Sequence, residues 1–360
     1  MLKVDSLKEI TKIKKTKFYS SILLIMDNKE KSIILSDSKG IIHIYDSKNN
    51  FEEKLTIEFT KDKLNGKNNE INFISLKNQN EIIITFSELI KCISIYKEIS
   101  NNNSFVFKYK EIFSLSLNLK DFHFYQCISL KSIENQLVSS CLKEIIHSWI
   151  LNNNNPNINS LYRVKKVISV CNKDTSSYLL EIPKLKLLVT CSFKDCILKF
   201  FDLSNNYRFI SKINKIGQGY YEGCLSLINS YLFVVSGEGI KGIYLIDAKY
   251  KEIIQQIQIN GYIGWINCIF ADTNYNESNP NKMVFYTGGE FEDLKKKFSC
   301  DFQQYGIING EITLLKSKKN VHDEKISSII FYFPYLDNQK DNNKFIFWSV
   351  TKIDIKIWSI

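Results

Sequence analysis

The sequence predicts an all-β protein made of seven similar four-stranded units, and three observations carry this prediction. Short runs rich in Ile, Phe, Tyr and Val alternate with clusters of Asn, Asp, Gly, Ser and Lys, which is the pattern of strands joined by turns. No apolar stripe with helical spacing lasts for more than about two turns, so long helices are not expected. One repeat also recurs along the whole chain and divides it into units of similar length.

Each unit of the repeat has four predicted strands, and the third strand ends with an aromatic or large apolar residue that is often followed by Asp. The clearest unit has its strands at 177–182, 187–192, 197–202 and 207–213. The middle strands are almost wholly apolar, whereas the fourth strands are more polar. We therefore expect the middle strands to be covered on both faces and the fourth strands to meet water. The least regular unit has its strands at 265–270, 283–287, 298–305 and 311–316.

The residues that close the third strands recur at a nearly constant spacing. Successive closing residues lie 45 to 59 positions apart. They are Tyr45, Tyr96, Trp149, Phe201, Ile246, Tyr305 and Trp358. Four-stranded units of roughly this length are the sequence pattern of β-propeller blades. The sequence therefore predicts a seven-bladed β-propeller.

The two ends of the chain are expected to complete one blade between them. The last unit, about 322–360, stops at its third strand, and a lone strand at about 7–14 precedes the first complete unit. When that strand pairs as the fourth strand of the last blade, no sheet edge is left open by the ends of the array. We therefore expect a single propeller domain over residues 1–360, with its last blade closed by the N-terminal strand.

These units resemble WD40 repeats over essentially the whole chain. The best match is CSFKDCILKFFDL, in which Asp195 stands in the tight turn, and Phe201 and Asp202 stand where the family has its Trp-Asp dipeptide. In the family, a turn Asp, a His, a Ser or Thr and the Trp form a buried hydrogen-bond network that stiffens a blade. The resemblance makes Asp195 and Ser192 candidate members of such a network here, although no unit carries the full set.

The resemblance implies structural roles for residues of other units as well. Tyr45 with Asp46 matches the dipeptide more weakly, and Trp149 and Trp358 keep its aromatic residue without the Asp. His322 stands in the remnant of the Gly-His pair that opens a family repeat. We expect these side chains to shape the blades rather than to bind a partner.

The charge composition predicts a surface covered with lysine. The chain has 48 basic and 38 acidic residues, which gives a formal net charge of +10, and Arg163 and Arg208 are its only arginines. Arginine is the residue that forks onto phosphate, and the lysines are spread along the chain. We interpret the excess charge as a solvated surface. Nucleic-acid binding stays open as an alternative, which a continuous positive stripe would favour.

The sequence carries no pattern of a membrane-spanning or secreted protein. No run of about 20 apolar residues is present, as a transmembrane helix requires. The N-terminal residues lack the apolar segment of a secretory signal. The nine cysteines follow no regular framework and are expected to be reduced, mostly buried thiols. We therefore expect a cytoplasmic or nuclear protein that is monomeric when isolated.

Motifs for catalysis or cofactor binding lack the context that they need. Gly237, Gly239 and Gly242 match G-x-G-x-x-G, but the residues that follow predict a strand instead of the helix that would hold a pyrophosphate. The four histidines fall in different units, and no Cys or His pair has zinc spacing. No G-x-S-x-G elbow occurs. We therefore expect no enzyme activity, no cofactor and no metal; an enzyme would need acids and histidines converging in a central channel.

Aromatic residues gather in the loops that the blade order places on one rim, before the first strand and between the second and third. The candidate partner-binding residues of this rim are Phe122, Phe193, Lys194, Tyr220, Tyr221 and Tyr262. Tyr and Phe beside Lys are typical of interface hot spots, although packing under neighbouring blades is an equal alternative. On the opposite rim, the 272–281 loop is expected to be a solvated, flexible tip.

The function expected from these observations is that of a non-catalytic protein-protein interaction scaffold of WD40 type, acting as a subunit of a larger complex. The alternative is a non-catalytic subunit of an RNA-modifying or other nucleic-acid-linked complex. The two differ in where the lysines fall and in how steeply binding depends on salt. The sequence does not indicate which protein is the partner.

Overall fold

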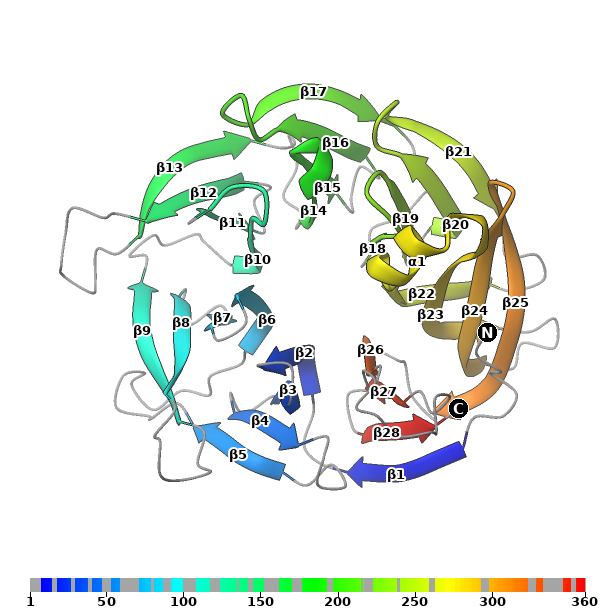
Figure 1. Cartoon of the computed structure of the whole chain (residues 1–360), viewed down its shortest axis with the longest axis horizontal. Helices are drawn as coiled ribbons and strands as arrows, with labels where there is room; N and C mark the ends of the chain where they lie inside the picture. The colour runs from blue at the N-terminus through cyan, green and yellow to red at the C-terminus, as the bar shows by residue number, and fades with distance from the viewer. Residues whose placement is uncertain are drawn as a thin grey trace. The chain divides into compact units, whose positions relative to one another are not determined.

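The fold consists of strands that are joined by tight turns into small antiparallel sheets (Figure 1). A computed structural model of the chain describes residues 8–14, 18–26, 30–37, 41–46, 53–58, 71–78, 81–86, 92–99, 108–116, 124–134, 136–141, 145–151, 162–169, 177–192, 197–214, 216, 223–237, 240–258, 263–292, 298–322, 328–332, 346–350 and 354–359. Within these residues, strands β1 to β28 form seven four-stranded sheets. The chain divides into two compact units, which are described in turn.

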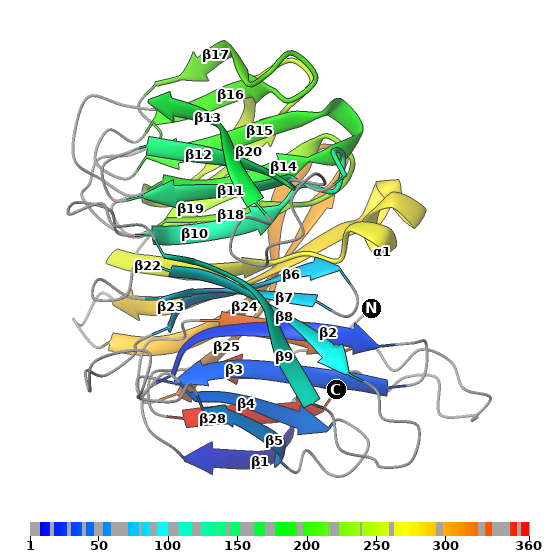
Figure 2. The same ribbon diagram turned by 90° about the vertical axis from the view of Figure 1, so that its left-hand side faces the viewer.

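The unit made of Thr16–Leu179 contains three of these sheets. Their strands are, in order, β2 (Phe18–Met26), β3 (Glu30–Asp37), β4 (Ile41–Asp46) and β5 (Glu53–Glu58); β6 (Ile71–Asn78), β7 (Glu81–Phe86), β8 (Cys92–Ile99) and β9 (Lys108–Ser116); and β10 (Phe124–Ser129), β11 (Gln136–Cys141), β12 (Ile145–Leu151) and β13 (Tyr162–Ser169). Figure 2 shows β2 to β5 side by side. The first strand of the middle sheet, β6, contacts the first strands of both other sheets.

The unit made of Met1–Lys15 and Leu180–Ile360 contains the other four sheets, except for residues 177–179, which fall in the first unit. The first three are β14 (Ser177–Ile182), β15 (Leu187–Ser192), β16 (Ile197–Asp202) and β17 (Arg208–Ile213); β18 (Gly223–Leu227), β19 (Leu232–Gly237), β20 (Ile240–Asp247) and β21 (Glu252–Ile257); and β22 (Ile263–Phe270), β23 (Met283–Glu292), β24 (Phe298–Ile308) and β25 (Glu311–His322). The last sheet has the order β26 (Ser328–Tyr332), β27 (Ile346–Val350), β28 (Asp354–Ser359) and β1 (Lys8–Lys14). The first strand β22 contacts β18 and β26.

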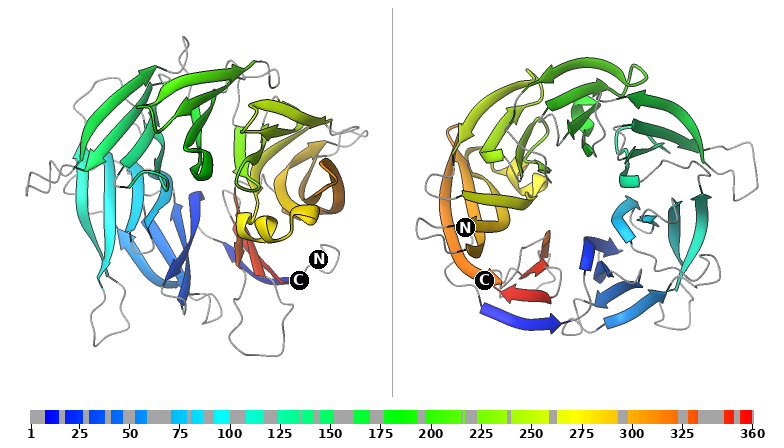
Figure 3. Two further views of the ribbon diagram at one scale, coloured as in Figure 1. Left: turned by 45° about the horizontal axis from the view of Figure 1, so that its top comes forward. Right: turned by 180° about the vertical axis from the view of Figure 1, so that it is seen from behind.

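The N-terminal strand completes the last sheet, as the sequence predicts. β1 pairs antiparallel with β28, with Lys8 opposite Ser359 and Lys14 opposite Asp354. In Figure 3 the blue strand β1 runs beside the red strand β28. Since β28 has β27 on its other side, this pairing leaves neither edge of β28 open.

The same irregularity marks the end of the third strand in each of the seven described sheets. There the register to the fourth strand shifts by one residue, which is a β-bulge. The shift occurs at the closing residues that the sequence aligns, Tyr45, Tyr96, Trp149, Phe201, Ile246, Tyr305 and Trp358. The sequence repeat and the structural repeat therefore coincide at the closing residue of each third strand.

The core lies between successive sheets and is built from the middle strands. One cluster packs β14–β17 against β18–β21, where the Phe200 and Phe233 rings meet edge to face at 6.3 Å. A second cluster packs β18–β21 against β22–β25, and within the latter sheet the cross-strand partners Phe285 and Tyr305 stack with their ring centres 5.2 Å apart. The fourth strands β17 and β21 are mostly exposed along their length. The predicted contrast between covered middle strands and a solvated fourth strand is thus confirmed in these sheets.

The structure decides two further expectations. The glycine motif lies at a hairpin, because β19 ends at Gly237 and β20 begins at Ile240, so the predicted strand follows it. Gly242 has a φ of +145°, and a Cβ there would lie 2.0 Å from the carbonyl oxygen of Ile257. The predicted flexible tip at 272–281 is wrong in part, because Thr273–Ser278 forms the short helix α1, followed by a 3₁₀ turn at Pro280–Lys282.

Candidate protein-interaction site

The rim residues that the sequence nominates cannot be placed in this fold. Phe122, Phe193, Lys194, Tyr220, Tyr221 and Tyr262 all lie outside the described residues. Their part in partner binding therefore stays a prediction. The turns described below belong to the opposite rim, which joins first to second and third to fourth strands.

The predicted blade residues that the structure describes are buried or bound within their turns. Tyr45, Trp149, Phe201 and His322 are each at most 4% exposed. Asp202 accepts hydrogen bonds at Oδ1 from the backbone N–H groups of residues 204 and 205, at 2.9 and 3.2 Å, which fixes the turn to β17. Asp195 and the side chains of Asp46 and Trp358 lie outside the described atoms, although Trp358 itself lies in β28.

One blade carries a polar contact that the sequence analysis missed. The Trp149 indole Nε1–H donates to Ser139 Oγ at 2.8 Å, from β12 to β11, in a buried position. The His147 ring lies 5.6 Å from the Trp149 ring and is also buried. His147 and Ser139 are direct cross-strand partners. The sequence feature that indicates this contact is a Ser two residues after the strand partner of the closing Trp. A Ser hydroxyl at that position can accept a hydrogen bond from the indole N–H.

Two other sheets keep the hydroxyl but lack the indole. Thr190 and Thr287 occupy the position of Ser139, two residues along from the partner of the closing residue. Both are fully buried, and neither hydroxyl has a hydrogen-bond partner among the described residues. Their closing residues are Phe201, which has no donor, and Tyr305, whose hydroxyl donates to Gln303 at 2.5 Å instead.

Three exposed tyrosines stand on the described rim of the second unit, and we call them the tyrosine rim. Tyr250 is 65% exposed, Tyr231 42% and Tyr275 39%. Tyr231 lies in the β18–β19 turn, Tyr250 in the β20–β21 turn and Tyr275 on α1. The Lys249 ammonium lies 5.2 Å from the centre of the Tyr250 ring, within cation–π range.

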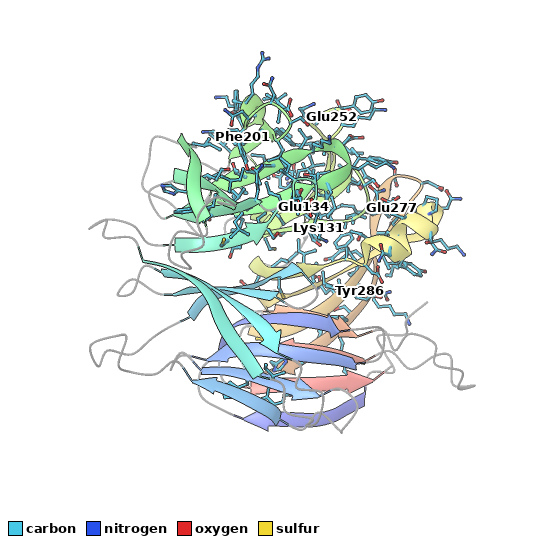
Figure 4. The ribbon with its side chains drawn as sticks, turned by 60° about the vertical axis from the view of Figure 1, so that its left-hand side comes forward. Lys131, Glu134, Phe201, Glu252, Glu277 and Tyr286 are labelled. Carbon is cyan, nitrogen blue, oxygen red and sulfur yellow. The ribbon has the colours of Figure 1, made fainter. Side chains whose placement is uncertain are left out.

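Hydrogen bonds join the three segments that carry these tyrosines. The Tyr231 carbonyl accepts from Ala248 N–H at 2.8 Å, which ties the two turns of one sheet together. The N–H of Ser230 donates to the Glu277 carboxylate on α1. Figure 4 shows Glu277 on that helix. The three tyrosines therefore belong to one connected surface.

Side chains of the turns also fix the backbone beneath the tyrosines. Asp247 Oδ1 accepts from the N–H groups of Lys249 and Tyr250, at 2.7 and 3.1 Å. Asn229 Oδ1 accepts from those of Tyr231 and Leu232, at 3.0 and 2.8 Å. Such Asx turns hold a short loop in one conformation, so little ordering entropy remains to be lost when a partner binds.

Helix α1 is pinned to both neighbouring sheets by one buried side chain. Asp272 caps its N-terminus by accepting from Tyr275 N–H at 3.0 Å. Asn276 is fully buried and its Nδ2 donates to the carbonyls of Ile228 and Val284, both at 3.0 Å. Its Oδ1 accepts from Val284 N–H at 2.7 Å. The Asn276 side chain thus forms hydrogen bonds with backbone groups on both sides of the helix. These bonds hold the helix on the rim.

The titratable groups beneath the rim are buried in their neutral forms. Burial raises the pKa of the Cys224 thiol well above its usual value, with the neighbouring Cys268 and Cys191 adding to the shift. Burial likewise raises the phenol pKa of Tyr286 and of Tyr305. Each of these groups is therefore protonated at neutral pH, and none is activated as a nucleophile.

Within the described part of the chain, no group of three or more His, Cys, Asp or Glu side chains is placed to hold a metal ion. No helix in the described segments is long and apolar enough to cross a membrane.

The described rim presents aromatic side chains on fixed segments beside charged side chains. Such a surface suits contact with another macromolecule.

Comparisons with known proteins match this architecture in structure alone. No protein-family model matches the chain, and no curated protein sequence does. The WD40 domain of Toxoplasma gondii coronin is similar with a TM-score of 0.62 and 12% identity, over 98% of this chain and 85% of that one. The β-propeller domain of Myceliophteria thermophila Cps50 (Swd1) has a TM-score of 0.65 and 11% identity, over 98% and 99%.

A third similar structure is Chaetomium thermophilum Sqt1 bound to the N-terminus of the ribosomal protein L10. Its TM-score is 0.60 and its identity 11%, over 97% of this chain and 98% of that one. At such identities the likeness concerns the fold, and it spans nearly the whole chain. The protein therefore has the WD40 β-propeller fold that its repeats indicate.

Proposed function

We propose that this chain is a non-catalytic protein-protein interaction scaffold that acts as a subunit of a larger complex. The observation that carries the proposal is the tyrosine rim, where three exposed aromatic side chains stand on two turns and a short helix that hydrogen bonds hold in place. Tyrosine presents a large amphipathic surface at low entropic cost, which is why it recurs in interface hot spots. Chaetomium thermophilum Sqt1, of the same fold, is bound to a segment of another protein.

A single seven-bladed propeller domain over residues 1–360 is part of this proposal. The similar structures support it, since each is matched over at least 97% of this chain. A rigid scaffold of this kind holds its loops in fixed positions, so a partner contacts a preformed surface. One domain predicts one cooperative unfolding transition by both fluorescence and circular dichroism. Two transitions separated in urea would contradict it.

Affinity purification of the tagged chain, with identification of the proteins that co-purify, tests the scaffold role. Replacing Tyr231, Tyr250 and Tyr275 together by Ala is expected to lower partner recovery about tenfold or more, because hot-spot side chains dominate binding. The matched control is Leu314→Ser, which removes a side chain 49% exposed on the outer strand β25 and leaves the rim intact.

A second variant set decides between the two rims. Phe193, Tyr221 and Tyr262, the residues nominated by the sequence, are replaced together by Ala in the same assay. Loss of the partner in that set alone would move the interface to their rim. If a specific partner survives both triple replacements, neither rim binds it.

A further inference from the structure

The strand β21 is the open edge of its sheet. In the order β18, β19, β20, β21 it has a strand on one side only, and Figure 1 shows it on the outside of its sheet. An open edge presents unpaired backbone N–H and C=O groups to any other extended chain. Among the described residues, β21 makes its ladder to β20 and one further hydrogen bond, which the Gln255 side chain accepts from Ile312 N–H on β25. No other described strand therefore covers the outer edge of β21.

Among the outer strands of the seven described sheets, β21 alone has no basic residue. Its sequence, EIIQQI, contains one charged residue, Glu252, which begins the strand and is labelled in Figure 4. Charged side chains on an edge strand, lysine above all, are a common protection against pairing with another chain. Each of the other outer strands has at least one lysine: Lys12 in β1, Lys54 in β5, Lys110 in β9, Lys165 in β13, Lys212 in β17 and Lys318 in β25. The edge of β21 lacks this protection.

The side chains and the register of β21 suit pairing with a further strand. Ile253 is 39% exposed and Ile254 is 44% exposed. Beyond the β-bulge at Ile254, residues 255–257 keep a regular register with β20, opposite residues 243–245. A short segment of Ile and Gln with low net charge and without Pro or Gly has the composition that pairs edge to edge. A further strand would therefore extend an existing regular ladder.

The distribution of charge along β21 favours a second copy of this chain as the occupant. Because Glu252 stands at one end of the strand, two antiparallel copies keep their carboxylates at opposite ends of the pair, and like charges do not meet. In β17 the same arrangement would bring Arg208 of one copy toward Lys212 of the other. Each chain has one such edge among its described strands, so the pairing uses both edges and stops at two copies.

We propose that two copies of this chain associate by antiparallel pairing of β21 with β21. The backbone ladder supplies the hydrogen bonds, and cross-strand neighbours cover part of Ile253 and Ile254. One strand pair buries a small area, so the association is weak and depends on concentration. The sequence predicts a monomer instead, because it does not show which strand edge stays open. The dimer goes beyond the scaffold role and does not depend on it.

Sedimentation velocity of the purified full chain, from about 1 to 300 µM, tests the proposal. The weight-average mass is expected to rise from 42.0 kDa with concentration and to level off at twice that mass. Gln256→Lys gives β21 the basic residue that the other outer strands have, and is expected to weaken association at least about tenfold. Since Gln256 is exposed, this variant is expected to keep an unchanged urea midpoint.

Two further variants show whether β21 pairs with its own copy. Thr313→Lys, the matched control, adds the same charge at an exposed position of β25, which already contains lysines, and is expected to leave the mass curve unchanged. Gln256→Glu is expected to weaken association as Gln256→Lys does. An equimolar mixture of these two variants is expected to associate again, because residue 256 lies near the middle of the strand and opposite charges then come close together.

A constant mass of 42.0 kDa over the whole concentration range would overturn the proposal. Equal weakening by Thr313→Lys and Gln256→Lys, or a mixture of the two Gln256 variants that stays monomeric, would do the same, since another surface would then be responsible. A mass that passes twice 42.0 kDa without a plateau would mean open-ended aggregation. If the chain stays monomeric but binds a labelled peptide of residues 250–258, the edge accepts the strand of another protein. These measurements use the pure chain, so they are independent of partner recovery by the tyrosine-rim variants.

Discussion

At the scale of single residues, the residues that close the third strands of two blades differ in one hydrogen-bond donor, the indole N–H. Trp149 and Phe201 stand at equivalent bulges, each near a hydroxyl on the neighbouring strand. Trp149 donates to Ser139, whereas Thr190 beside Phe201 has no partner among the described residues. A buried hydroxyl without a partner lowers stability, while a paired one is costly to remove. The two blades therefore predict opposite responses to the same kind of substitution.

Ser139→Ala is expected to lower the free energy of unfolding by about 1–3 kcal/mol, because it leaves the Trp149 indole N–H buried and unpaired. Thr190→Val has nearly the same shape as Thr and removes only the unpaired hydroxyl, so it is expected to be neutral or stabilising. The urea midpoint of each variant measures the difference. Equal destabilisation by both substitutions would mean that the hydrogen bond to Ser139 adds no stability.

His147 predicts a dependence of stability on pH. Burial lowers the pKa of His147 below 6.5 in the folded protein, so the unfolded chain binds the proton more readily. The stability that this difference provides is present above pH 6.5 and is lost as pH falls from there toward the folded-state pKa. His147→Gln is therefore expected to unfold at a urea midpoint that changes less than the wild-type midpoint between about pH 7.5 and 5.5. A constant difference between the two proteins would show that His147 does not titrate on unfolding.

The sequence foretold which residues close the third strands, yet it missed the Ser139 contact. The closing residues are recognisable because their spacing is regular and they are large and apolar. The hydrogen bond depends on which Ser faces which strand end, and that requires a register that sequence spacing alone does not define. The resemblance to the family predicts a network at Asp195 and Ser192, whereas the observed pair, Trp149 and Ser139, lies in another unit and forms without the Asp.

At the scale of elements, helix α1 shows a segment whose conformation comes from its surroundings. The sequence TNYNES has no apolar stripe, and a helix of six residues is unstable in isolation. Its stability comes from the Asp272 cap and from the three hydrogen bonds of Asn276 to neighbouring strands and turns. Composition therefore predicted a loop here, because the decisive partners lie elsewhere in the sequence.

Asn276→Ala is expected to lower the free energy of unfolding by about 2–4 kcal/mol, since it leaves the Ile228 and Val284 carbonyls and the Val284 N–H without their partner. Faster amide exchange of Val284 than in the wild type would report the local loosening directly. The control is Ser278→Ala on the same helix, whose exposed hydroxyl bonds only within the helix, to Asn274. A comparable loss from Ser278→Ala would mean that the helix itself, and not its anchoring, carries the effect.

At the scale of the whole molecule, the repeat was the most informative part of the sequence. Its spacing predicted the strand pairs of the described sheets, including the irregular unit at 263–322, because alternation and turn composition are local signals. The face that binds a partner is a different matter. Loop side chains take their positions from contacts that have no periodicity, and the nominated aromatic residues stay predictions.

Removal of residues 1–15 is expected to lower the thermal midpoint and to increase light scattering, because β28 then presents an unpaired edge. A synthetic peptide of residues 1–15, added in excess, is expected to restore the midpoint by pairing with β28, and a scrambled peptide of the same composition is not. Unchanged stability of the shortened chain would show that the β1–β28 pairing adds nothing to the folded state.

The β1–β28 pairing also affects the order in which the sheets can form during synthesis of the chain. On the ribosome, β1 leaves the exit tunnel before the other described strands, and the strand that it pairs with is made only after about 340 further residues. For that whole period β1 has no native partner, while sheets made of consecutive strands are already able to form. Closure must then bring together two strands that are about 340 residues apart in the sequence, and contacts over such separations are slow to form. The last step of folding is therefore expected to be the pairing of β1 with β28. Nascent chains released before residue 354 is made are expected to keep β1 unpaired and accessible to chaperones.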